Sequence, residues 1–142
     1  MTTIIPDISM VDTGSLRSDL IAFGMSTLEL HFGPRADAFL RLTAEAYHVP
    51  ELAARWETVR GNQITTARTI VRRAIRTGEL PKGVSVTVLL DAIFGGILMH
   101  TLAVPPHLRD RASAEGPAHV EQLVDLALAG VAATAKCAGR RS

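Results

Sequence analysis

The chain has very little of several residue types that mark common classes of protein. Of its 142 residues only Cys137 is a cysteine, so no internal disulfide can form, and a reducing cytosol is the simplest setting. Aromatic residues make up 4% of the chain and the formal net charge is only +1. A free-standing DNA-binding domain is usually more basic. The composition therefore gives no electrostatic reason to expect nucleic acid or a membrane as a partner.

Signals for export and for membrane insertion are missing as well. The opening residues, MTTIIPDISM, have neither the basic start nor the long apolar run of a secretory signal. No stretch of about 20 residues is free of charge, so we expect no transmembrane span and a cytoplasmic protein.

The familiar motifs of enzymes are also absent. The chain has no P-loop, no G-x-G-x-x-G and no G-x-S-x-G, and no set of nucleophile, base and orienting residue stands out. Glu45 and His48 form one E-x-x-H pair, whereas a di-metal bundle needs two such pairs with further carboxylates. We therefore expect no enzyme, no metal and no cofactor. The alternative is a small α-helical enzyme with Glu45, His48 or His100 as acid–base groups, or a stand-alone dimer that binds a small molecule.

The chain is rich in helix-forming sequence. Hydrophobic residues make up 47%, Ala and Leu are frequent, and apolar residues recur at steps of three and four. This pattern predicts an all-α fold of five helices. They run from Ser15 to Phe32, from Arg35 to Tyr47, from Pro50 to Gly78, from Ser85 to Val104 and from Pro117 onwards.

Residues with known preferences for helix ends set these boundaries. Ser15 or Asp12 can cap the first helix, and Gly78 suits the C-terminal end of the long third helix. Pro117 is placed at a first helical position, where its missing N–H costs nothing, so residues 105–116 are expected to form a polar, mobile loop. The predicted organisation is an N-terminal segment 1–11, one domain 12–136 and a tail 137–142.

The fourth predicted helix, VTVLLDAIFGGILMHTLAV, is apolar nearly all round. A surface helix of a soluble protein is polar on one side. This helix must therefore be covered on two faces, one by its own domain and one by another partner.

Four phrases, in their order and spacing, carry a family resemblance. They are DTGSLRSDL, AYHVPELAARWETVRGNQITTARTIVRRAIRTGEL, LLDAIFGGILMHTL and HVEQLVDLALAGV, and they cover about residues 12–135. The chain resembles the C-terminal domain of tetracycline-repressor (TetR) family transcriptional regulators. The resemblance implies a domain that binds a small effector and forms a homodimer through a four-helix bundle of the last two helices of each subunit.

The resemblance also implies a DNA-binding head with a helix-turn-helix before residue 12. Residues 1–11 contain no pair of amphipathic helices and no Lys or Arg. We therefore expect the head to be absent from this chain, and DNA to be bound only through such a head.

Two groups of residues follow from the resemblance and the helix pattern. A mostly apolar effector is expected between the first, third and fourth helices, beside Trp56, with Met and aromatic side chains that adapt to apolar ligands. The predicted ligand-binding residues are Phe23, Met25, Leu28, Trp56, Gln63, Ile64, Phe94 and Ile97. The predicted dimer-interface residues are Leu89, Ile93, Gly96, His100, Val120, Leu123, Val124 and Leu128.

Overall fold

The computed structural model describes residues 12–140, which form five α-helices and one short 3₁₀ turn, as the sequence predicts for an all-α fold. The predicted segment 1–11 and the last two residues of the predicted tail lie outside the described residues. In chain order the elements are α1 (Leu16–Phe32), α2 (Ala36–Glu45), α3 (Pro50–Thr77), α4 (Val86–Ala103), η1 (Pro106–Leu108) and α5 (Arg109–Gly139).

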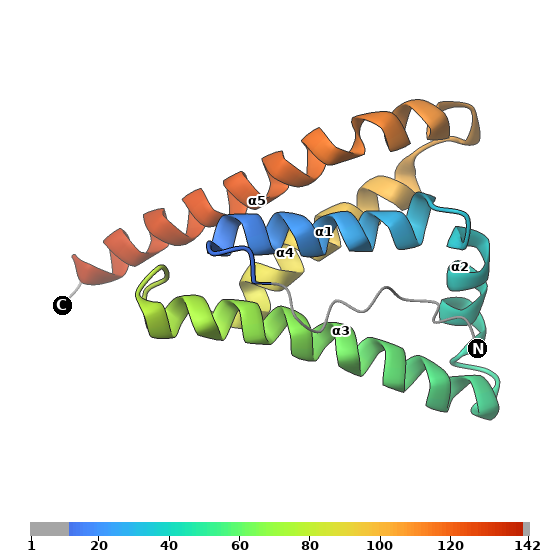
Figure 1. The fold of residues 1–142 in the computed structure, drawn as a ribbon, viewed down its shortest axis with the longest axis horizontal. Helices are drawn as coiled ribbons and strands as arrows, with labels where there is room; N and C mark the ends of the chain where they lie inside the picture. Colours follow the sequence, from blue (N-terminus) through green and yellow to red (C-terminus); the bar gives the residue numbers. More distant parts are fainter. Residues whose placement is uncertain (1–11, 141–142) are drawn as a thin grey trace.

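Helix α1 is the centre of the arrangement. It contacts each of the other four α-helices, and in Figure 1 it lies between the long helices α3 and α5, with α4 behind it. The short helix α2 connects α1 to α3 at one end of the molecule. Helix α1 therefore packs against α5, so the two ends of the described chain are held together.

The predicted helix starts and ends are largely confirmed. The Ser15 side chain accepts a hydrogen bond from the Ser18 N–H, and Ser85 caps α4 in the same way. Pro50 opens α3, and Gly78 ends it with φ of 86°, a left-handed conformation that glycine adopts without steric cost. These ends follow from local chemistry, which is why the sequence alone predicts them.

The predicted start of the last helix is wrong. Helix α5 begins at Arg109, the residues expected to form a mobile loop are mostly helical, and Pro117 lies inside the helix. Ala112 and Gly116 are buried, and a Cβ at Gly116 would collide with the Leu28 side chain of α1. Packing against α1 therefore stabilises the first turns of α5 and outweighs the cost of an internal proline.

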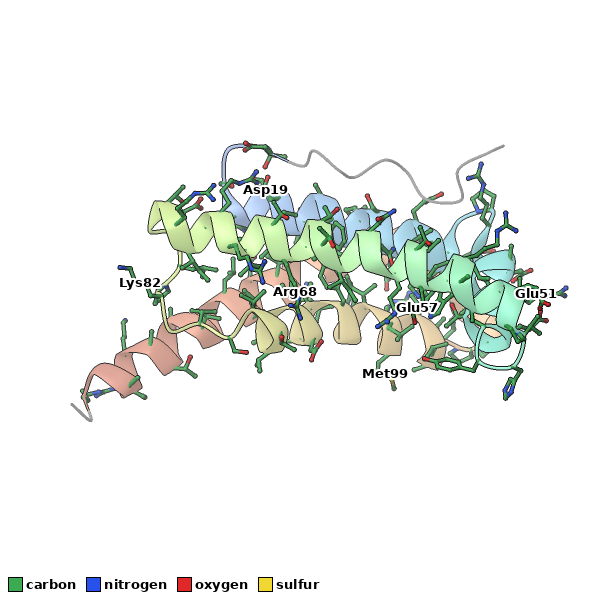
Figure 2. All side chains as sticks on the ribbon, turned by 90° about the horizontal axis from the view of Figure 1, so that it is seen from below. Asp19, Glu51, Glu57, Arg68, Lys82 and Met99 are labelled. Carbon is green, nitrogen blue, oxygen red and sulfur yellow. The ribbon has the colours of Figure 1, made fainter. Side chains whose placement is uncertain are left out.

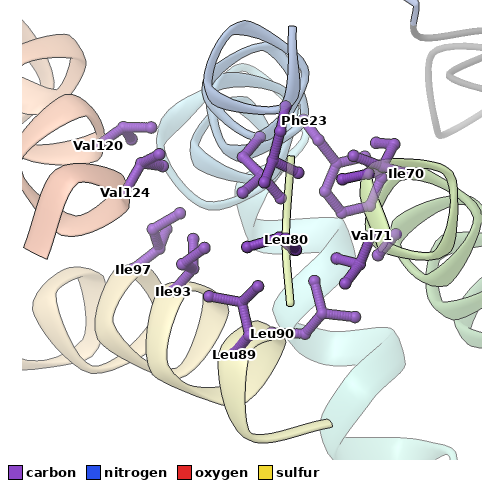
Figure 3. Close-up of a cluster of buried hydrophobic side chains, with 14 of the residues drawn as sticks. Phe23, Ile70, Val71, Leu80, Leu89, Leu90, Ile93, Ile97, Val120 and Val124 are labelled. Carbon is purple, nitrogen blue, oxygen red and sulfur yellow. The ribbon is translucent and has the colours of Figure 1, made fainter. Parts of the chain in front are cut away.

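The core is built from the inward faces of α1, α3, α4 and α5 (Figure 3). Ile93 and Ile97 of α4 face Val120 and Val124 of α5, and all four are fully buried. Helices α1 and α5 approach closely at Gly24, where a Cβ would lie 2.7 Å from Val120 Cγ1. Any larger residue at this contact would therefore force α1, α5 or the Val120 side chain to shift.

The DTGSLRSDL phrase opens α1 and ties it to α3. Asp19 is only 2% exposed, and one of its carboxylate oxygens accepts hydrogen bonds from the Thr13 N–H (2.6 Å) and the Thr13 hydroxyl (2.8 Å). Its other oxygen pairs with the Arg73 guanidinium of α3, which also lies 3.4 Å from Asp12. A buried carboxylate is tolerated only when it is paired and hydrogen-bonded, and Asp19 meets both conditions.

The turn between α3 and α4 also contacts the start of α1. The Glu79 carboxylate accepts a hydrogen bond of 2.9 Å from the Leu16 N–H, one of the backbone groups that a helix leaves without an internal partner. Its negative charge lies at the positive end of the α1 dipole. Leu80, next to it, is buried in the core.

Candidate functional site

The outer face of α4 is apolar and uncovered. Within the described residues, α4 is the one helix that is long and apolar enough to cross a membrane, by length and composition. Only 28% of its 18 residues are buried within the chain. Val88, Met99 and Leu102 are 67%, 63% and 57% exposed, and Figure 2 shows Met99 pointing away from the molecule. Exposed apolar side chains gathered on one face mark an interaction surface.

Helix α5 contributes one large apolar side chain to the exposed surface. Leu126 is 72% exposed, and the neighbouring residues on that side of α5 are exposed as well. Leu126 follows His119 and Leu123, which contact α4, at helical steps of three and four, so it lies on the side of α5 next to α4.

The structure buries half of the predicted interface residues inside one chain. Leu89, Ile93, Val120 and Val124 are 2% exposed or less, so they have almost no surface to offer to a second copy. Their burial is explained by the core that α4 and α5 form with α1 and α3. The remaining four, Gly96, His100, Leu123 and Leu128, are partly buried.

Gly96 and Gly95 differ in the side of α4 that they occupy. A Cβ at Gly96 would lie 2.8 Å from a methyl carbon of Leu123 in the same chain, whereas a Cβ at Gly95 would meet nothing within 4 Å. Gly96 therefore serves the contact between α4 and α5 of one subunit, and Gly95 lies on the open face.

Two histidines stack where α4 and α5 meet. The rings of His100 and His119 are 4.0 Å apart at an angle of 27°, and Nε2 of His119 is buried without a hydrogen-bond partner in the described structure. Burial lowers the pKa of His119 below its usual 6.5, and the nearby His100 lowers it further. The surroundings of His119 therefore favour its neutral form.

The predicted ligand-binding residues do not surround one open space. Phe23, Leu28 and Ile97 are buried in the core, and the rings of Phe23 and Phe94 pack edge to face with centroids 4.9 Å apart. Ile64 is 40% exposed. Met25, Trp56 and Gln63 are partly buried.

Trp56 itself packs on α2. Its ring centroid lies 5.7 Å from that of Phe39, which in turn packs edge to face on His31 of α1. The aromatic cluster of Trp56, Phe39 and His31 therefore joins α3, α2 and α1 at the end of the molecule where α2 lies.

A small cavity lies near this cluster. It measures about 80 Å³ and is lined by His31, Leu40, Thr101, Leu102 and Arg109. These residues come from α1, α2, α4 and the start of α5. Two of them, His31 and Thr101, are polar side chains buried to more than nine-tenths. The sequence does not predict this site, because its residues are spread over four elements and the predicted last helix begins only at Pro117.

A larger, open groove of about 550 Å³ lies at the other end, between the start of α1, the turn before α4 and the second half of α5. Its lining is mostly apolar and includes Leu80, Pro81, Leu128 and Val131. Its two charged groups already have partners: Arg17 binds Asp125 at 2.7 Å, and Glu79 caps α1.

The acid–base residues of the alternative enzyme hypothesis come from two parts of the fold. Glu45 and His48 are exposed around the end of α2, and His100 is in α4. Among residues 12–140, no group of three or more His, Cys, Asp and Glu side chains is placed to hold a metal ion.

Comparison with known proteins agrees with this architecture. A family model described as "Tetracyclin repressor-like, C-terminal domain" matches residues 10–127, which is well over half of the chain. The chain belongs to this family. Searches of the curated proteins and of the solved structures found no match. Domains of the TetR family are found in transcriptional regulators, where they bind effectors and dimerise, and they are typically not enzymes.

Two regions of this TetR-like domain stand out in the described residues. One is the uncovered apolar face of α4, and the other is the aromatic cluster and small cavity at the α2 end.

Proposed function

We propose that the chain is the homodimeric, effector-binding domain of a TetR-like regulator, and that two copies meet through the outer faces of α4 and α5. The observation that carries this proposal is the exposure of α4: a helix apolar on all sides is covered by its own subunit on one side only. The family supplies the identity of the second cover, a second copy of the same chain.

The proposed contact surface differs from the one predicted from the sequence. The outward residues of α4 follow one another at alternating steps of four and three, which is the spacing of a helix that packs lengthwise against another helix. We define the outer stripe as Val88, Ala92, Gly95, Met99 and Leu102. His100 stays in the proposal at the edge of this surface, whereas Leu128 lines the groove beside the start of α1.

The apolar outer stripe is also the kind of surface that a membrane could cover. We favour the second copy because Asp91 is exposed on the same helix, and a charged carboxylate is costly against lipid but is accommodated at the rim of a protein interface.

Effector binding is the second part of the proposal. Helices α1, α3 and α4 hold the residues expected to contact an apolar effector beside Trp56, and a ligand there must displace side chains that now touch. In a regulator with helix-turn-helix heads, such a change would alter the spacing of the two heads in the dimer, which decides whether they reach successive major grooves. We expect such a regulator to act in the cytoplasm, without a cofactor.

Sedimentation of the purified chain tests the dimer. We expect the wild-type chain to be a dimer at micromolar concentration and the Met99→Glu variant to be a monomer, because the substitution places a charge in the middle of the outer stripe. The matched control is Ile64→Glu, which changes an apolar residue that is also exposed but lies on α3. A monomeric wild type, or equal dissociation by both variants, would refute the proposed surface.

A further inference from the structure

The small cavity at the α2 end of the molecule has polar groups where a core usually has none. His31 is 7% exposed and Thr101 is 4% exposed, and both line the 80 Å³ space together with Leu40, Leu102 and Arg109. Buried polar groups in proteins are almost always hydrogen-bonded, so the partners of each of these groups show what remains for a ligand.

His31 has one ring nitrogen to spare. Its Nδ1 lies 2.8 Å from the Thr27 carbonyl oxygen in the same helix, and a carbonyl can only accept, so Nδ1 carries the proton. In the neutral ring Nε2 is then a hydrogen-bond acceptor, and no partner for it is found within residues 12–140. Nε2 of His31 is not one of the buried atoms without a partner in residues 12–140, so it is an acceptor that solvent or a ligand in the cavity can reach.

Arg109 brings a positive charge to the same cavity. One of its guanidinium nitrogens donates to the His31 carbonyl oxygen at 3.1 Å, and the guanidinium lies over the Phe32 ring at 5.1 Å. These contacts hold the group at the cavity, yet no Asp or Glu pairs with it in the described part of the chain. A partly buried guanidinium has five N–H donors and is suited to a carboxylate.

The positive charge at the cavity comes from the Arg109 side chain and not from the end of α5. The 3₁₀ turn η1 runs directly into α5, and the Arg109 N–H donates to the Pro106 carbonyl oxygen. Asp110 lies in the first turn of α5, where a carboxylate offsets the positive end of the helix dipole.

The volume of the cavity limits the size of a ligand that it can hold. An apolar cavity of roughly 150 Å³ holds benzene, so a space of about 80 Å³ takes a molecule of about five heavy atoms or the head of a longer one. Thr101 donates its hydroxyl hydrogen to the Leu98 carbonyl oxygen, so toward the cavity it can only accept.

We propose that the cavity between His31, Thr101 and Arg109 binds a small carboxylate that also carries a hydrogen-bond donor, with the carboxylate at Arg109 and the donor facing Nε2 of His31. A short 2-hydroxy acid such as glycolate has this combination. The proposal narrows the chemical class of the effector and rests on the effector-binding role proposed above, but it places the ligand in the cavity lined by His31 and Arg109 and not beside Trp56.

An NMR titration of the full, ¹⁵N-labelled chain tests the proposal with glycolate, acetate and glycolamide at equal ionic strength. Glycolate has only five heavy atoms, so affinity will be low and a method that detects weak binding is needed. We expect saturable shifts around His31 and Arg109 with glycolate. Acetate lacks the donor and should bind about 2- to 10-fold more weakly, and glycolamide lacks the charge and should lose tenfold or more.

Three variants assign the binding to the cavity. Arg109→Gln should weaken glycolate binding at least tenfold, and Arg109→Lys should retain part of it because the charge remains. The control is Arg111→Gln, which removes an arginine two residues later that is exposed and bound to Glu115. Circular dichroism of each variant verifies that the helices are intact.

The outcomes separate the site from the dimer. Glycolamide binding as well as glycolate, an equal loss from Arg111→Gln, or no saturation by about 100 mM glycolate would overturn the site. Equal binding of acetate and glycolate would overturn the role of His31 as the acceptor. Sedimentation of the same samples reports the oligomeric state independently: a dimer without glycolate binding refutes only the site, and glycolate binding by a monomer refutes only the proposed dimer.

Discussion

The close approach of α1 and α5 at Gly24 makes a quantitative prediction for Gly24→Ala. The new Cβ would lie 2.7 Å from Val120 Cγ1, and Val120 is fully buried. A β-branched side chain cannot turn away without leaving its preferred rotamer, so the two helices must separate. The matched control is Gly61→Ala, in the middle of α3, where a Cβ would meet nothing within 4 Å.

Two effects of known size decide the outcome. Replacing glycine by alanine inside a helix stabilises it by up to about 1 kcal/mol, and this gain applies to both variants. Overpacking a well-packed core costs about 1–3 kcal/mol, and this cost applies only at Gly24. We therefore expect Gly61→Ala to raise the free energy of unfolding by up to about 1 kcal/mol, and Gly24→Ala to leave it unchanged or lower it by up to about 2 kcal/mol.

Urea unfolding of both variants, followed by circular dichroism, measures this difference. The Met99→Glu background keeps dimerisation out of the comparison. A double mutant with Val120→Ala tests whether the contact with Val120 is the cause. Without Val120 Cγ1, Gly24→Ala should lower the free energy of unfolding by less, with a coupling energy of about 0.5–3 kcal/mol. Equal stabilisation by Gly24→Ala and Gly61→Ala would show that α1 and α5 do not meet at this distance.

Further predictions concern the buried carboxylate and the histidine pair. Asp19→Asn should lower the free energy of unfolding by about 1–3 kcal/mol, because it removes the charge that Arg73 faces. Asp12→Asn changes an exposed carboxylate beside the same arginine. In the same urea experiment it should lower the free energy of unfolding by less than about 1 kcal/mol. Because the folded-state pKa of His119 is lowered, the unfolded chain binds more protons, so stability should be fully present above about pH 6.5 and fall as the pH drops toward the lowered pKa. His119→Gln should reduce this dependence, and His100→Gln should leave most of it because burial is the larger cause; melting temperatures between pH 8 and pH 5 that do not change would contradict this assignment.

The ends of the helices could be predicted where local chemistry decides them. Ser15, Pro50, Gly78 and Ser85 act through their own side chains or backbone, and each lies where the sequence places it. The start of α5 was wrongly predicted at Pro117, because the preference of proline for a first turn is local. The first turns of α5 are stabilised instead by contacts with α1. A signal was present: Arg111 and Glu115 are four residues apart and form an ion pair.

The direction in which α4 faces could not be predicted. Its sequence is apolar on all sides, so periodicity distinguishes no inner face. The structure shows Ile93 and Gly96 turned toward the subunit and Gly95 and Met99 turned outward, a choice made by the partners α1 and α5. The same reason explains why the small cavity was missed, because its polar groups only meet once four elements have packed.

The position of α1 has a consequence for synthesis of the chain on the ribosome. Gly24 and Leu28 of α1 lie against Val120 and Gly116 of α5, and the ion pair between Arg17 and Asp125 joins residues 108 positions apart. Translation proceeds at about 5–20 residues per second, so the apolar side of α1 stays without its last cover for several seconds after it emerges. During that interval the nascent chain presents a hydrophobic helix to chaperones and to neighbouring nascent chains, and folding is completed only when α5 has left the exit tunnel.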